Sequence, residues 1–235
     1  MIWFVCEIDT GDNMILLLGD VHGDTNVLNR AIKLANEVGA TAVIQVGDFG
    51  LMPGRSEESF YSVCKDSPVP VYFIEGNHDD CTRWIQYTEV SKVWDDANLW
   101  YIPRGTVMEM DGRTIAFMGG AASIDKDIRL REHMHWDENE NIAPHEVLRL
   151  MDNAEGKTID MFITHCPPNS VIEEHFDNSV KIQFNVGLDW HDHNQDIIEK
   201  IWHGIGTPMV YSGHMHRRVQ GMTYRILDIN ELLAV

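Results

Sequence analysis

Five short apolar runs in this chain are each followed by a block of Asp, Asn or His residues. The runs cover residues 14–18, 42–46, 69–74, 159–163 and 208–212, and the blocks are Gly19-Asp20-Val21-His22-Gly23, Gly47-Asp48, Gly76-Asn77-His78-Asp79-Asp80, Thr164-His165 and Gly213-His214-Met215-His216. Apolar runs of this length, closed by glycine or a polar residue, are typical of buried strands. Ligands of an open α/β sheet bind at the carboxyl ends of its strands. We therefore predict that the five blocks meet at one rim.

The first half of the chain alternates strand and helix patterns. Residues 24–38 carry apolar side chains at helical spacing, with Asp24 or Thr25 available as the N-cap and Gly39 as the stop. Between the first two strands this helix makes a βαβ unit. Further helices are expected over 57–64, 80–90, 144–153 and 195–202, and further strands over 99–102, 106–110, 114–118 and 224–229. The hairpin signal Asp111-Gly112 marks a change to antiparallel strands, so we predict an α/β fold with a second or mixed sheet.

Three segments fit this pattern less well. Residues 1–13 are expected to add an N-terminal strand or to be an extension, since Met14 is an alternative start. Residues 121–142 and 170–195 lack a clear period, and we expect them to be loops on the substrate side of the site. The length of 235 residues favours a single domain over 1–235.

The composition restricts the class of partner. The formal net charge of −19 disfavours long nucleic acid, because the field of the protein would repel phosphates. No apolar stretch is long enough to cross a bilayer, so no membrane partner is expected. The four cysteines are scattered without a CxxC pair, which favours reduced thiols and a cytoplasmic location, the host cytoplasm if the chain is phage-encoded. The oligomeric state stays open.

The residue types of the five blocks suit metal chemistry. Carboxylate, amide and imidazole ligands without thiolate fit manganese, iron, zinc, cobalt or nickel. A carboxylate such as that of Asp48 can bridge two ions. Two metals roughly 3.5–4 Å apart clamp a phosphoryl group and generate hydroxide near neutral pH. A metal-dependent phosphoryl-transfer site is therefore predicted.

The blocks resemble those of the calcineurin-like metallophosphoesterase family in their usual order: GDxHG, GD, GNHD, a strand ending in His, and GHxH. The match runs from Asp20 to His216. The resemblance implies a four-layer α/β/β/α sandwich of two mixed sheets flanked by helices, with a dinuclear site at the strand ends. It implies hydrolysis by in-line attack of a hydroxide that bridges the metals.

The resemblance also implies roles for individual residues. The first metal would be held by Asp20, His22 and His216, the second by Asn77, His165 and His214, and Asp48 would bridge both. His78 would face the phosphate and protonate or stabilise the leaving oxygen. Asp79 would orient His78 or a ligand. The cofactors would be two divalent ions, with manganese favoured and iron, zinc, nickel or cobalt as alternatives.

The substrate class is predicted from what the chain lacks. Ser/Thr protein phosphatases of the family carry an Asp and an Arg shortly after the bridging Asp, where this chain has Phe49-Gly50-Leu51-Met52. They also have Glu where the third block has Asp79. A small-molecule phosphodiester, nucleotide-type and including cyclic nucleotides, is therefore favoured, because a diester carries one charge and needs less positive clamping than a monoester. The alternatives are a phosphomonoesterase, a Ser/Thr protein phosphatase and a non-catalytic protein-binding scaffold.

Several residues outside the five blocks have two interpretations. Arg129 and Arg131 could bind the substrate phosphate, or lie on a solvated loop. The block "GGAASID" with a following Arg resembles segments of small bacterial and phage family members. The pairs His133/His135 and His191/His193 could bind metal or belong to a lid near the site, although we expect surface or loop roles. Cys166 is expected to be a packed apolar residue rather than a nucleophile.

Overall fold

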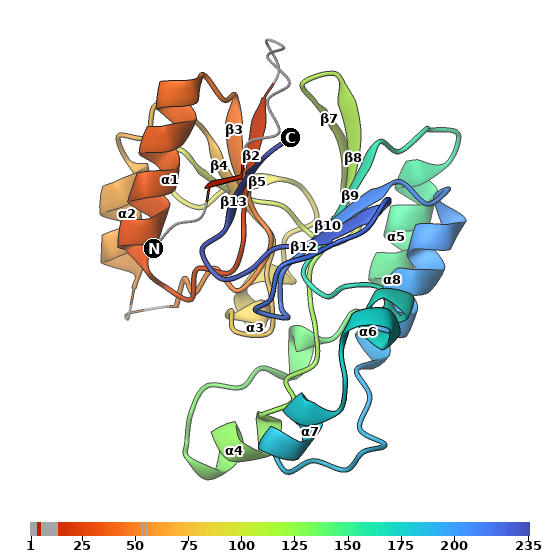
Figure 1. Ribbon diagram of the computed structural model, residues 1–235. Coiled ribbons are helices and arrows are strands. Elements are labelled where there is room, and N and C mark those ends of the chain that lie inside the picture. The colour runs from red at the N-terminus through yellow and green to blue at the C-terminus, as the bar shows by residue number, and fades with distance from the viewer. Residues whose placement is uncertain (1–3, 6–13, 53, 55) are drawn as a thin grey trace.

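The computed structural model describes residues 4–5, 14–52, 54 and 56–235, and these form two sheets (Figure 1). The first sheet contains, in spatial order, β1 (Phe4–Val5), β13 (Leu232–Ala234), β2 (Ile15–Leu18), β3 (Ala42–Gln45), β4 (Val71–Phe73), β6 (Leu99–Tyr101) and β5 (Ser91–Lys92). The second contains β11 (Val219–Gln220), β12 (Tyr224–Ile226), β10 (Met209–Ser212), β9 (Met161–Thr164), β8 (Arg113–Met118) and β7 (Val107–Met110).

Helices cover the outer face of each sheet (Figure 1). The helices α1 (Thr25–Val38) and α2 (Glu57–Cys64) lie over the first sheet, and α5 (Pro144–Ala154) and α8 (His193–Gly204) over the second. Between them the two sheets face each other. The predicted four-layer α/β/β/α sandwich is therefore confirmed.

All four residues of β2 are apolar and buried, because both faces of this central strand are covered. In β2, Leu16 and Leu18 pack in the cluster that includes the apolar face of α1, while Ile15 and Leu17 pack with Phe117 of the second sheet. The alternation of strand side chains thus builds two core layers from one strand.

The central strands of each sheet are parallel, and this determines where the polar blocks that follow them lie. The strands β2, β3, β4 and β6 are parallel neighbours, and so are β8, β9, β10 and β12. Their carboxyl ends therefore lie at one edge of the sandwich. The predicted βαβ unit is present, with Asp24 accepting hydrogen bonds from Asn26 N at 3.0 Å and Val27 N at 3.3 Å as the N-cap of α1.

Four details of the sequence prediction were wrong or incomplete. The strand β6 pairs parallel with β4 instead of opening the antiparallel part. The helix expected over 80–90 ends early, as α3 (Cys81–Trp84). The strand β13, which was not predicted, inserts antiparallel to β2. Of the expected N-terminal strand only β1 lies within the described residues, and it pairs parallel with β13.

The two irregular segments contain short helices. Residues 121–142 include α4 (Lys126–Arg131) and the 3₁₀ turn η1 (Glu138–Glu140), and residues 170–195 include α7 (Ser179–Gln183) and most of α6 (Asn169–His175). Helices of five to seven residues show too few repeats for a periodic pattern. Figure 1 shows α4 and α7 projecting beyond α3, on the side of the sandwich where the strand ends lie.

Candidate metal centre

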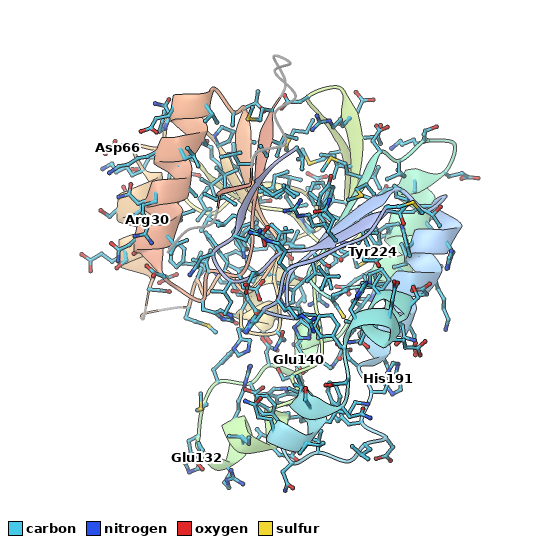
Figure 2. All side chains as sticks on the ribbon, viewed as in Figure 1. Arg30, Asp66, Glu132, Glu140, His191 and Tyr224 are labelled. Atoms are coloured by element: carbon cyan, nitrogen blue, oxygen red, sulfur yellow. The ribbon has the colours of Figure 1, made fainter. Side chains whose placement is uncertain are left out.

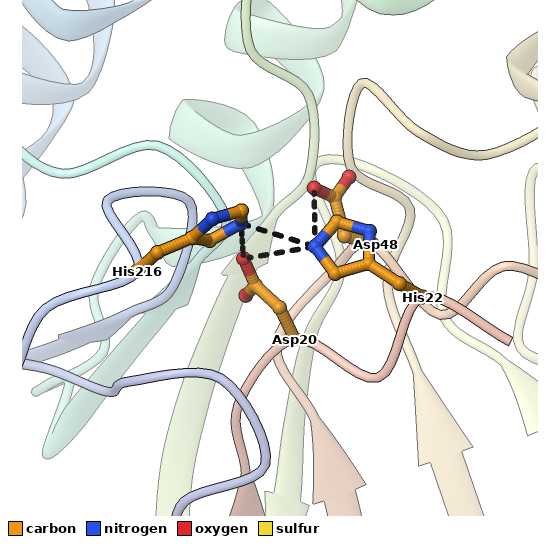
Figure 3. Close-up of side chains that lie close together, drawn as sticks. All are labelled: Asp20, His22, Asp48 and His216. Carbon is orange, nitrogen blue, oxygen red and sulfur yellow. Dashed lines mark hydrogen bonds and ion pairs between the residues drawn. The ribbon is translucent and has the colours of Figure 1, made fainter. Parts of the chain in front are cut away.

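Four of the predicted ligands form one compact group (Figure 3). One donor atom from each of Asp20, His22, Asp48 and His216 lies within 4.8 Å of the others. His216 Nε2 is 3.1 Å from Asp20 Oδ2, and His22 Nε2 is 3.0 Å from His216 Nε2 and 3.8 Å from Asp48 Oδ2. These side chains come from the ends of β2, β3 and β10, which the sequence separates by nearly the whole chain.

The other three predicted ligands gather on the opposite side of Asp48. His165 Nε2 is 3.3 Å from Asp48 Oδ1 and 3.2 Å from Asn77 Oδ1. The rings of His165 and His214 meet edge to face with centroids 5.0 Å apart. Asp48 therefore presents Oδ2 to the first group and Oδ1 to the second.

The charges of this cluster depend on one another. Burial disfavours the charged form of Asp48, but His165, His78 and His22 outweigh it and hold the pKa of Asp48 well below its usual range. Burial likewise opposes a charged His165, yet the neighbouring Asp48 raises the pKa of His165 to about 9. A buried carboxylate whose two oxygens face separate sets of imidazole and amide donors fits two divalent cations.

The backbone is strained at four of the predicted ligands. His22, Asp48, His214 and His216 all have positive φ angles, of 48°, 57°, 67° and 50°. This conformation costs a non-glycine residue about 1 kcal/mol or more, and it clusters at functional sites. Gly76 allows the loop after β4 to approach the site closely, because a Cβ there would collide with the backbone of Asp48 and with the His165 ring.

The buried carboxylate of Asp79 joins the loops that follow β3 and β4. It accepts hydrogen bonds from Gly76 N at 2.8 Å, Phe49 N at 3.1 Å and Gly50 N at 2.6 Å. Burial and then the charge of Asp48 raise the pKa of Asp79 to about 7 in spite of these bonds. The bonds tie the backbone just after Asp48 to the backbone just before Asn77, and none of these three bonds involves the His78 ring.

His78 lies beside this cluster and contacts Arg129. Its backbone N–H donates to Asp48 Oδ1 at 2.8 Å, and Arg129 Nη2 lies 2.5 Å from His78 Nε2 and 2.9 Å from His78 Nδ1. Arg129 is also held by Asn77 O at 3.1 Å and by Asp125 at 2.9 Å. Burial, assisted by the charge of Arg129, lowers the pKa of His78 to about 4, so the ring is neutral at pH 7.

The two arginines singled out in the sequence have different positions. Arg129 is only 3% exposed although it belongs to the short helix α4. The Arg131 side chain is 69% exposed and pairs with Glu132 at 3.2 Å. A helix turns 100° per residue, so neighbours two apart point to different faces.

A cavity of about 630 Å³ opens beside His22 and His78. One wall is formed by Gly50, Met52 and Ser56, and the other by Arg129 and residues 133–135. The segment 121–142 therefore contributes Arg129 and residues 133–135 to the lining of this cavity.

Three side chains outside the cluster, those of His175, His203 and Cys166, have hydrogen-bond or ion-pair partners of their own. His175 Nε2 contacts Tyr224 Oη at 2.6 Å, and His203 Nε2 pairs with Glu199 at 2.8 Å. The thiol of Cys166 is buried and donates to Asp192 Oδ2 at 3.4 Å, and burial raises its pKa well above the usual range. Cys166 is therefore a poor nucleophile.

The sequence comparisons identify the family. The model of the calcineurin-like phosphoesterase family matches residues 14–218, which includes every predicted metal ligand. The chain belongs to this family, a class of metal-dependent hydrolases that act on phosphoester bonds. Among the curated proteins, no sequence matched the chain.

Solved structures share the fold at low sequence identity. The crystal structure of TT1561 of Thermus thermophilus is 16% identical, with a TM-score of 0.56 over 92% of this chain and 89% of that chain. A second crystal structure is 11% identical, with a TM-score of 0.53 and the same coverage.

In the part of the chain that the structure describes, no helix is long and apolar enough to cross a membrane.

We expect replacement of Asp79 by Ala to destabilise the fold. The buried N–H groups of Phe49 and Gly76 and the partly buried N–H of Gly50 would lose their acceptor, at about 1–3 kcal/mol for each unsatisfied buried group, so the free energy of unfolding should fall by roughly 3 kcal/mol or more in urea titration. The neighbouring Asp80→Ala removes only the N-cap bond to Arg83 N and should cost about 1 kcal/mol. Equal losses in the two variants would contradict the role assigned to Asp79.

Proposed function

We propose that this protein is a dinuclear metal-dependent phosphodiesterase that acts on a nucleotide-type small molecule, cyclic nucleotides included. The observation that carries the proposal is the position of Asp48, whose two oxygens face separate ligand groups beside an open cavity. One carboxylate between two donor sets is the arrangement a two-metal phosphoryl-transfer site needs.

The ligand groups suggest how the metals would be held. Asp20, His22 and His216 would hold the first ion, Asn77, His165 and His214 the second, and Asp48 would bridge them. When bound, two divalent ions lower the pKa of water and neutralise charge on a phosphoryl group. We propose manganese for both positions, with iron, zinc, nickel or cobalt as alternatives that the same donors would accept.

His78 and Arg129 would act on the substrate from the side of the cavity. Both line it, and among the described residues of its lining Arg129 is the only Lys or Arg. We propose that the neutral His78 ring donates a hydrogen bond to the leaving oxygen. The Arg129 guanidinium would bind a non-bridging phosphate oxygen. Arg131 is exposed and pairs with Glu132, so Arg129 alone would contact the substrate.

The lining of the cavity favours a diester over a phosphoprotein. Gly50 and Met52 occupy the wall that follows Asp48, where protein phosphatases carry charged residues. A diester has one negative charge, which a single arginine beside the metals can match. The net charge of −19 further supports a small substrate over long nucleic acid, and the buried free thiols of Cys64, Cys81 and Cys166 support a cytoplasmic location.

The test compares bis(p-nitrophenyl) phosphate with p-nitrophenyl phosphate, after removal of metal with chelator and reloading with Mn²⁺. We expect kcat/KM for the diester to exceed that for the monoester by about tenfold or more, and His78→Asn to lower kcat by about 10²–10⁴ with both metals retained. A preference for the monoester would shift the assignment to phosphomonoesterase. Two bound metals with no turnover of either ester would support the scaffold alternative.

Arg129→Ala should destabilise the transition state for diester hydrolysis, whereas Arg131→Ala should not. The loss of a charged hydrogen bond costs about 1.5–3 kcal/mol, which corresponds to a roughly 10- to 150-fold fall in kcat/KM for the diester. Arg131→Ala, two residues away on the same helix, is the matched control and should remain within about twofold of wild type. Equal effects of the two substitutions on kcat/KM would contradict a role of Arg129 in binding the substrate phosphate.

A further inference from the structure

The Asn77 amide has two ends, of which only the oxygen can bind a metal. In the structure Oδ1 faces His165 Nε2 at 3.2 Å, and Nδ2 donates to Ser123 Oγ at 3.1 Å. We infer that Ser123 and Glu140, neither of which belongs to the five motif blocks, are positioning residues that keep the oxygen of Asn77 turned toward the metal centre. This inference rests on the proposed function.

The hydrogen bonds that link Glu140, Ser123 and Asn77 form a relay. Their directions favour one orientation of the Asn77 amide over the other. Ser123 has one hydroxyl hydrogen, and it donates that hydrogen to Glu140 Oε2 at 2.6 Å. The Ser123 oxygen is then left with lone pairs only, so it can accept from an NH₂ group but cannot donate to a carbonyl oxygen. A flipped Asn77 amide would place oxygen against oxygen and would turn its NH₂ toward the metal. Glu140 therefore selects one of two otherwise similar amide orientations.

Glu140 is itself held rigidly. It is 2% exposed, and its Oε1 accepts from Ser123 N at 2.8 Å. The buried guanidinium of Arg104 donates to the backbone oxygens of Asn139 at 3.0 Å and Asn141 at 2.7 Å, on both sides of Glu140. Figure 2 shows Glu140 between the sheet sandwich and the projecting α4 and α7. A fixed acceptor of this kind loses little entropy when it orients its neighbour.

The relay gives the segment 121–142 a second task besides lining the cavity. Partners of metal ligands that sit outside the coordination shell commonly affect metal affinity by about 10–100-fold. Because Ser123 contacts Asn77 and none of the ligands of the first group by hydrogen bond, its loss should weaken the second metal selectively.

The experiment is a Mn²⁺ titration of the chelator-stripped chain by calorimetry. Ser123→Ala should raise the Kd of one of the two ions by about 10–100-fold and leave the other within about twofold, and Ser123→Thr, which keeps the hydroxyl, should restore wild-type binding. Ser170→Ala is the matched control, because Ser170 also donates through both N and Oγ to a glutamate, Glu199, on the surface.

Unchanged binding in Ser123→Ala, or equal weakening of both ions, would overturn the inference. Because the titration measures binding and not turnover, it is separate from the ester assay. Wild type that binds two ions without hydrolysing a diester would contradict the proposed function and leave the relay standing.

A different cluster carries a second inference. His191 Nε2 is 2.8 Å from Asp196 Oδ2, the rings of His191 and His193 have centroids 5.4 Å apart, and one donor atom from each of the three residues lies within 4.8 Å of the others. We propose that these residues form an additional site for a divalent transition metal such as zinc. Two imidazoles and a carboxylate leave further positions to water, as in open zinc sites.

The backbone between the two histidines is anchored from inside the protein. The carboxylate of Asp192 is buried, accepts from Asn194 N at 2.8 Å as the N-cap of α8, and accepts from Ala122 N at 3.1 Å. This fixes the positions from which His191 and His193 extend, while the side chains of His191 and Asp196 remain 34% and 39% exposed and open to an ion. Figure 2 shows His191 on the side of the molecule where α6 and α8 lie.

Equilibrium dialysis against micromolar Zn²⁺ tests this second site. His193→Ala should bind one ion fewer per chain than wild type and keep the wild-type rate of diester hydrolysis. His203→Ala is the control, because His203 pairs with Glu199 on the same helix at the same 2.8 Å but with no third donor among the described residues, and it should bind as many ions as wild type. Equal ion counts in His193→Ala and wild type would overturn the proposal.

Discussion

The site depends on one buried carboxylate at the end of β3. Asp48 is 1% exposed, and a charge in that position is costly unless other groups compensate for it. The histidines around it supply that compensation, His22 toward one oxygen and His165 toward the other. The arrangement that stabilises the carboxylate in the folded chain is also the arrangement that divides the donors into two groups. Electrostatics and function therefore impose the same geometry.

The fold holds this geometry through the backbone. The predicted ligands with positive φ lie in short loops immediately after strands that are hydrogen-bonded on both sides. Asp79 supplies a second constraint, because its carboxylate accepts from the loops after both β3 and β4. The strain at His22 and Asp48 is therefore balanced by the packed strands before them and by hydrogen bonds across the rim. Such a rim fixes the positions of the predicted ligands.

The segment 121–142 adds contacts to the candidate site that the five motif blocks do not supply. It brings Arg129 to His78, Ser123 to Asn77, and residues 133–135 to the wall of the cavity. A long segment with little regular structure is unusual within a compact domain unless it has a function. Arg104 anchors this segment at η1 through hydrogen bonds to Asn139 O and Asn141 O.

The amino-acid sequence by itself determined the strands that precede each block, the family, and the identity of the candidate ligands. These depend on local signals, since apolar runs and the residues that follow them are adjacent in the chain. Only the tertiary structure decided that Arg129 and not Arg131 lies against His78, that β13 enters the first sheet beside β2, and that Ser123 and Glu140 reach Asn77. Each of these depends on a contact between residues that are not neighbours in the sequence, or on a choice of helix face, and no local pattern records either one.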